Sequence, residues 1–105
     1  MRSKGNEEKM ARSDMLMVFT YDVSSNKARR RVAKRLEEDA TRVQYSVFEG
    51  RMSKARADAL AQRVAAELGE GDSLRVYAVG ANGLERSHIY GDAAPFDNGE
   101  GFWVV

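Results

Sequence analysis

The order in which apolar strands and amphipathic helices alternate limits the fold of this chain more than any other sequence feature. Residues 15–23 (MLMVFTYDV) are a near-continuous apolar run rich in β-forming residues, which is typical of a strand covered on both faces. Residues 41–52 (TRVQYSVFEGRM) and 73–80 (SLRVYAVG) are also strand material. Between these strands, residues 27–40 and 54–68 carry apolar side chains at helical spacing. This alternation with short connections predicts helices packed against a sheet.

The segment 41–52 decides the topology. It is long enough for two short strands around a tight bend or for one bulged strand, and Gly50 is expected to break it near its end. With two strands the order becomes βαββαβ, which predicts an α+β, ferredoxin-like fold with an antiparallel sheet and two helices on one face. Residues 15–80 are then the folded domain. Residues 1–14 are polar and aperiodic, and we expect them to be a disordered N-terminal extension.

The last 25 residues, 81–105, are expected to form a C-terminal segment that adds a further strand. Residues 86–90 (RSHIY) are a weak strand candidate, and residues 102–105 (FWVV) are a stronger one. An apolar strand at a terminus is an exposed edge unless something pairs with it. We therefore expect residues 102–105 to pair across a dimer or with a partner chain, in preference to being an ordinary terminal strand.

Several classes of protein are excluded by composition. The chain has no cysteine, which rules out disulfides and thiolate metal sites. No apolar run approaches the roughly 18 residues that cross a bilayer, and the N-terminus lacks the apolar core of a signal peptide. The sequence therefore predicts a cytoplasmic protein without membrane contact. The single histidine, His88, is expected at the surface, and no glycine-rich phosphate loop stands between a strand and a helix.

The formal net charge of +1 hides a strong asymmetry along the chain. Residues 24–63 contain 11 Lys and Arg against 5 Asp and Glu, whereas residues 64–105 contain 2 against 7. A basic face attracts phosphate backbones through counterion release, although a solvated helix surface also carries charge without a ligand. The candidates for phosphate contact share the outer side of the first helix: Lys27, Arg30, Arg31, Lys34 and Arg35.

Asp22 ends a strand that otherwise looks fully buried, next to the start of the first helix and near several arginines. A structural role would be a second N-cap beside Ser24 or Ser25, or a salt bridge to Arg29, whose place on the inner side of the helix points it toward the end of the strand. The functional alternative is a ligand for a hard cation such as Mg²⁺. One carboxylate is a poor metal site, but a two-fold dimer would supply a second Asp22. The chemistry would be metal-assisted hydrolysis of a phosphodiester, with arginines holding the phosphates.

Four blocks of the sequence, MVFTYDV, KARRRVAKRLEE, TRVQYSVFEG and DSLRVYAVG, resemble the CRISPR-associated protein two family. The resemblance covers residues 15–79, and RVQYSVFEG is its most specific part, because no generic strand requires that polar and aromatic sequence. It implies a small ferredoxin-like homodimer that works beside the CRISPR integrase in the acquisition and integration of new spacers. Its implied partners are integrase dimers and prespacer DNA, with RNA as a further substrate.

The resemblance also implies roles for individual residues. Asp22 stands where the family has a magnesium-binding aspartate, duplicated across the dimer axis. Five other positions resemble ones linked to nuclease activity in some members: Tyr21, Arg29, Arg31, Arg42 and Phe48. The family includes metal-dependent endoribonucleases and double-strand DNases, and also members whose dimer is a structural hub without a need for catalysis. The sequence leaves open a nuclease, a structural DNA-binding hub and, as a third class, a ferredoxin-like small-ligand sensor.

Overall fold

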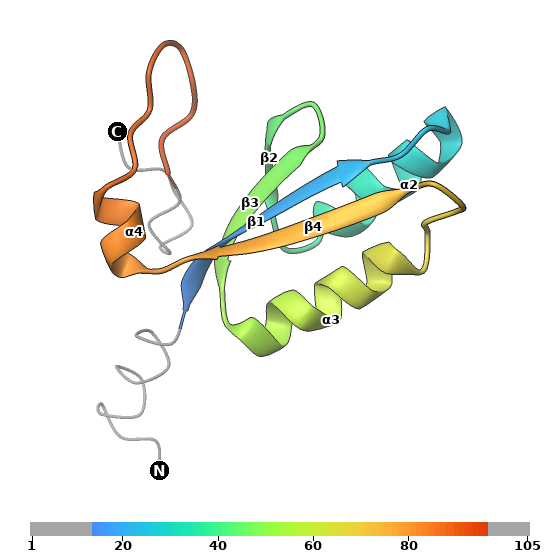
Figure 1. Ribbon diagram of the computed structural model, residues 1–105, viewed down its shortest axis with the longest axis horizontal. Coiled ribbons are helices and arrows are strands. Elements are labelled where there is room, and N and C mark those ends of the chain that lie inside the picture. The colour runs from blue at the N-terminus through green and yellow to red at the C-terminus, as the bar shows by residue number, and fades with distance from the viewer. Residues whose placement is uncertain (1–13, 97–105) are drawn as a thin grey trace.

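The computed structural model describes residues 14–96, which form an antiparallel sheet with helices packed against it (Figure 1). The elements in chain order are β1 (Met15–Asp22), α2 (Asn26–Leu36), β2 (Thr41–Gln44), β3 (Val47–Met52), α3 (Lys54–Ala65), β4 (Ser73–Val79) and α4 (Ala81–Glu85). The strand order is β2-β3-β1-β4, and each neighbouring pair is antiparallel. The predicted α+β, ferredoxin-like βαββαβ arrangement is confirmed.

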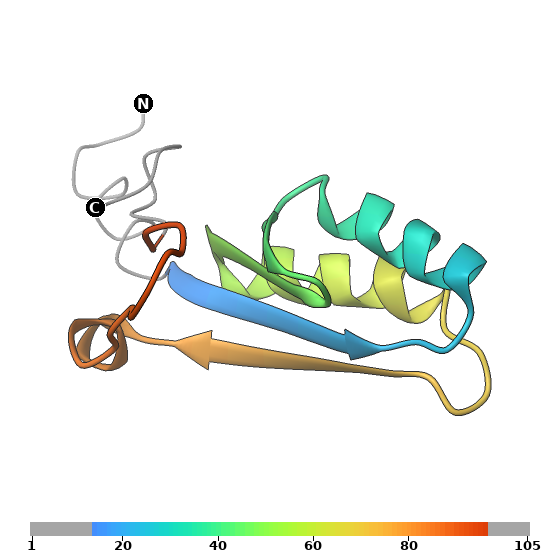
Figure 2. The same cartoon turned by 90° about the horizontal axis from the view of Figure 1, so that it is seen from above.

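Helices α2 and α3 lie side by side on the same face of the sheet, as Figure 2 shows. Alternate residues of β1 point toward them, because successive side chains of a strand point to opposite faces. Phe19 of β1 sits directly opposite Phe48 of β3, and both side chains are fully buried. Val32 of α2 and Leu60 of α3 complete this core from the helix side, also with no exposed surface.

Both long helices begin at the serine caps that the sequence predicts. The hydroxyls of Ser25 and Ser53 each accept a hydrogen bond from a backbone N–H in the first turn, at 3.2 Å. Both helices end earlier than the apolar pattern, at Leu36 and Ala65, because the following residues form tighter turns whose N–H groups bond three residues back. Ala40 and Leu68 still pack against the core from these turns.

The segment 41–52 forms two strands, β2 and β3, joined by a turn at Tyr45 and Ser46, with an irregularity in β2 between Arg42 and Gln44. The expected break at Gly50 was wrong, since this residue lies inside β3 and pairs with Met17. A Cβ atom at Gly50 would lie 2.9 Å from the carbonyl oxygen of Asp39. Glycine is therefore required because the connection between α2 and β2 passes directly over β3.

The C-terminal segment differs from expectation in one respect. The weak strand candidate at residues 86–90 was wrong, because these residues form no strand and follow the short helix α4. The hydroxyl of Ser87 donates to the carbonyl oxygen of Gly83 at 2.6 Å and so closes the last turn of α4.

Most of the proposed extension, residues 1–13, and the FWVV strand lie outside the described residues, so those predictions and the division at residue 80 stay predictions. In the part of the chain that is described, no helix has the length and apolar character to cross a bilayer.

Gly50→Ala is expected to destabilise the fold by about 1–3 kcal/mol, because the new methyl group presses on backbone atoms that cannot move aside. The matched control is Gly80→Ala, where a Cβ would meet nothing within 4 Å. Urea titrations of both variants measure the free energy of unfolding. Equal values for the two would show that the close approach at Gly50 is not a constraint.

Candidate functional site

Asp22 lies at the end of β1 on the open face, meaning the face of the sheet that α2 and α3 do not cover. Tyr21 points into the helix-side core, so the next side chain points the other way. The cross-strand partner of Asp22 is Ser73 of β4, and both residues are exposed. Within residues 14–96, the Asp22 carboxylate makes no hydrogen bond or ion pair.

Asp22 fills neither of the two structural roles considered for it, the N-cap of α2 and the salt bridge to Arg29. Ser25 caps α2. The Arg29 side chain points to the end of β1 as expected, but its Nη1 donates to the carbonyl oxygens of Val23 at 2.7 Å and Ser24 at 3.0 Å. The guanidinium thus satisfies the backbone of the β1–α2 connection and forms no salt bridge with Asp22. Asp22 is left as an exposed hard oxygen donor at a fixed strand end.

The connection that follows Asp22 is held by Asp72, which precedes β4. One carboxylate oxygen of Asp72 accepts from the backbone N–H of Ser24 at 3.2 Å and from its hydroxyl at 3.4 Å. The other oxygen accepts from the N–H of Gly69 at 2.8 Å. The hydrogen bonds from Gly69 and then from Ser24 hold the pKa of Asp72 below its ordinary value of 3.8. Asp72 therefore ties the β1–α2 connection to the α3–β4 connection.

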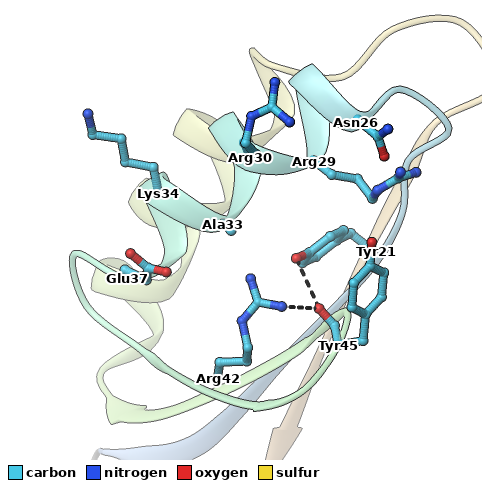
Figure 3. Close-up of a pocket in the computed structure, with 9 residues that line it drawn as sticks. All are labelled: Tyr21, Asn26, Arg29, Arg30, Ala33, Lys34, Glu37, Arg42 and Tyr45. Carbon is cyan, nitrogen blue, oxygen red and sulfur yellow. Dashed lines mark hydrogen bonds between the residues drawn. The ribbon is translucent and has the colours of Figure 1, made fainter.

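Four of the predicted nuclease positions come together on the helix side of the sheet, opposite the face that carries Asp22. The guanidinium of Arg42 lies over the Phe48 ring, 5.0 Å from its centroid, and the Tyr21 ring centroid is 6.4 Å from that of Phe48. Arg42 and the Tyr21 hydroxyl both donate to the carbonyl oxygen of Tyr45, the latter at 3.4 Å. Arg29 lies beside them (Figure 3).

Tyr21 acts chemically as a neutral donor in this group. Burial raises the pKa of its phenol, and the nearby charge of Arg42 only partly opposes that effect. The hydroxyl therefore keeps its proton at neutral pH and is available to donate a hydrogen bond, while it is a poor general base. Phe48 is fully buried, so it can only support Arg42 and the core.

These residues border a cavity of about 490 Å³ between α2 and the β2–β3 turn (Figure 3). We call it the α2–turn cavity, and its lining residues are Tyr21, Asn26, Arg29, Arg30, Ala33, Lys34, Glu37, Arg42 and Tyr45. Sequence reasoning missed Asn26, Glu37 and Tyr45. The one signal in the sequence was an aromatic residue at a turn position. In the structure, Tyr45 is 70% exposed and so contributes little to the core.

The five helix cations that the sequence grouped together are divided into two sets. Arg31 and Arg35 donate to the two carboxylate oxygens of Glu67, at 3.0 and 3.2 Å, and so connect α2 to the turn after α3. The other three, Lys27, Arg30 and Lys34, are exposed and make no ion pair with any described residue. Only these three leave their whole charge available to a ligand.

The described residues hold no cluster of three or more His, Cys, Asp or Glu side chains suited to a metal ion. Within residues 14–96, the carboxylate of Asp22 makes no hydrogen bond or ion pair, so its oxygens are free to bind a cation. This donor fits Mg²⁺ as one ligand, because Mg²⁺ prefers oxygen and commonly takes one or two carboxylates together with water and phosphate oxygens. A complete protein site needs a second donor from elsewhere.

Comparison with known proteins gives consistent matches. Residues 15–87 match the family model described as CRISPR associated protein Cas2. A Synechocystis protein named CRISPR-associated endoribonuclease Cas2 3 is 37% identical over 78 residues, which cover 73% of this chain and 85% of that protein. The crystal structure of Streptococcus pyogenes Cas2 has a TM-score of 0.62 and 34% identity, and the match covers 73% of this chain and 100% of that one. A chain of a partial Cas6-RT-Cas1–Cas2 complex has a TM-score of 0.63 and 25% identity, covering 71% of this chain and 83% of that one.

Asp72→Asn is expected to lower the urea midpoint of unfolding at neutral pH, because the amide cannot accept both sets of hydrogen bonds. The folded pKa is below the unfolded one, so the charged Asp72 stabilises the fold above pH 3.8, and this contribution is lost as pH falls through the folded pKa. The difference in urea midpoint between the variant and wild type should therefore become smaller in acid. Glu70→Gln, an exposed change in the same connection, is the control. A difference that stays constant with pH would contradict this assignment.

Proposed function

The chain belongs to the CRISPR-associated protein Cas2 family, and from that premise we propose that it acts in CRISPR adaptation. In this proposal it works with the CRISPR integrase in the acquisition and integration of new spacers, and it binds prespacer DNA. Two findings support the proposal: relatives carry the name endoribonuclease, and a similar chain occurs in a Cas1–Cas2 complex. A cytoplasmic location is part of the proposal.

We further propose that the protein is a metal-dependent endonuclease whose metal ligand is Asp22. The observation that carries this proposal is the carboxylate of Asp22, which is exposed at the end of β1 and has no partner within residues 14–96. Mg²⁺ or another divalent cation, when bound, supplies Lewis-acid assistance to phosphodiester hydrolysis. The protein contributes a ligand oxygen whose place is fixed by the β1–β4 ladder and by the Asp72 tie behind it.

A homodimer through the open face would complete the site. This face presents Val18 and Thr20 of β1, and Tyr77 of β4, which is 48% exposed and accepts a hydrogen bond from Arg75 at 3.1 Å. A two-fold axis near the end of β1 would bring two copies of Asp22 to one cation, because a two-fold interface places identical residues opposite each other. A domain of this size also gains stability when it buries such a face. The proposed pairing of residues 102–105 across the dimer would extend the same interface.

The other predicted catalytic residues receive different roles from their contacts. Arg42 and Arg29 keep free donors that can hold phosphate oxygens, because a guanidinium has five N–H groups and each uses only some of them here. Tyr21 is a hydrogen-bond donor, and Phe48 positions Arg42. Arg31 is held by Glu67, so its contribution to a phosphate site requires that this ion pair opens.

A purely structural hub is the second candidate function. The observation that favours it is the set of exposed cations on α2, Lys27, Arg30 and Lys34, which have no ion pair within the described part of the chain and attract any phosphate backbone without chemistry. A small-ligand sensor of the same fold is the third. It predicts no affinity for nucleic acid above background at physiological salt.

Asp22→Asn is expected to reduce Mg²⁺-dependent cleavage of RNA or DNA by at least about 100-fold, because losing even a supporting group of a metal site costs up to about that much. The control is Asp92→Asn, an exposed carboxylate beyond α4. Sedimentation of both variants checks that the dimer is retained. Full cleavage by a dimeric Asp22→Asn protein would exclude Asp22 as the metal ligand.

A spacer-acquisition assay with the same two variants separates the catalyst from the hub. Loss of acquisition with Asp22→Asn assigns the nuclease a role in adaptation. Intact acquisition assigns the protein a structural role there, even if cleavage occurs in vitro. A CRISPR array and an integrase gene beside the gene for this protein would support the pathway independently.

Arg30→Gln and Lys34→Gln are each expected to lower the steepness of the plot of log affinity against log salt for duplex binding by about one. Each variant removes one phosphate contact. Arg31→Gln and Arg35→Gln should change the slope less, because their two guanidiniums share the negative charge of Glu67, which offsets part of their charge. Fluorescence anisotropy at several salt concentrations measures the slopes. Equal effects from all four variants would show that the Glu67 pairs open on binding.

A further inference from the structure

We propose that the α2–turn cavity binds one unpaired nucleotide of a nucleic-acid strand, with the Tyr45 ring stacked on the base and Arg30, Lys34 and Arg42 around its phosphate. This inference rests on the proposed function, namely that the protein binds nucleic acid. It adds a binding subsite on the helix side of the sheet, opposite the face that carries Asp22. The subsite distinguishes an unpaired nucleotide from a paired one.

The shape of the cavity favours a single nucleotide. Its volume of about 490 Å³ is in the usual range for a small-molecule site, roughly 300–1,000 Å³. Its walls are a helix on one side and the β2–β3 turn on the other (Figure 3). A base inside a duplex has both faces covered by its neighbours, so only an unpaired base can enter such a space and offer a face to an aromatic ring.

The charge of the lining favours a phosphate. Four cations border the cavity, against a single acid, Glu37. Arg30 and Lys34 stand on α2 without an ion pair among the described residues, and Arg42 reaches toward the cavity from β2 (Figure 3). Arg42 keeps free N–H groups after its bond to the Tyr45 carbonyl. Glu37 lies at the end of the cavity away from the two tyrosines, where Lys34 also stands and opposes its charge (Figure 3).

Tyr45 is the residue that suggests a base. Its ring is 70% exposed, although a large aromatic side chain gains most from burial. Its backbone carbonyl is held by two donors, the Tyr21 hydroxyl and Arg42, so the turn that presents the ring is fixed before a ligand arrives. A fixed and solvent-facing aromatic ring beside cations is the usual arrangement for stacking a base next to a bound phosphate.

The test compares three probes in the absence of divalent cations: a short single strand, the same strand with abasic sites, and its blunt duplex. The proteins are the full-length wild type, Tyr45→Ala, and the matched control Tyr90→Ala, whose ring is 87% exposed outside the cavity. Fluorescence anisotropy at one salt concentration measures binding, and circular dichroism melting confirms that the variants fold. Tyr45→Ala should weaken binding of the intact strand at least about fivefold, the loss of one stacked base.

The same variant should change binding of the abasic strand and of the duplex by less than about twofold, because neither offers a free base at the cavity. Tyr90→Ala should change none of the three. Equal losses on duplex and intact strand, or no loss on either, would overturn the nucleotide subsite while leaving nucleic-acid binding intact. A wild-type protein that binds none of the three probes would instead refute the proposed function itself.

Discussion

The alternation of side chains along β1 is the constraint on which the rest of the structure depends. This strand is hydrogen-bonded on both edges, to β3 and to β4, so its register and its faces cannot change independently. Phe19 and Tyr21 are buried under the helices, and Asp22 must then project from the other face. A shift of one residue would bury the carboxylate and expose the aromatic core. The position of the candidate metal ligand is therefore a consequence of core packing.

The same core separates two chemically different surfaces. The open face offers the carboxylate of Asp22 and a sheet surface that α2 and α3 leave uncovered. The helix side offers cations and tyrosines around the α2–turn cavity. Residues that look like one catalytic group in the sequence, such as Tyr21 and Asp22, point to opposite faces. Between the two surfaces lies the end of β1, where Arg29 and Asp72 fix the backbone.

Electrostatic pairing between the helices decides which cations are available. Glu67 holds Arg31 and Arg35, and Asp39 similarly holds Arg56 and Arg63 of α3. These surface pairs contribute little stability individually. Among the described residues they leave Lys27, Arg30 and Lys34 as the exposed cations of α2 without an ion pair to Glu67, and Arg30 and Lys34 border the α2–turn cavity. A basic segment in the sequence thus becomes a localised basic surface.

The sequence by itself determined β1, α2, α3, β4 and the family, because these follow from apolar periodicity, serine caps and a specific motif such as RVQYSVFEG. It left open whether residues 41–52 form two strands or one bulged strand, and it did not predict α4. It also identified Asp22, since a charge at the end of a buried strand breaks the pattern. Tertiary structure alone decided that Gly50 continues β3, that Arg29 bonds to carbonyls, and that Tyr45 borders a cavity with Arg42 and α2. These outcomes depend on contacts between residues far apart in the chain, and the local periodicity of one sequence does not contain such contacts.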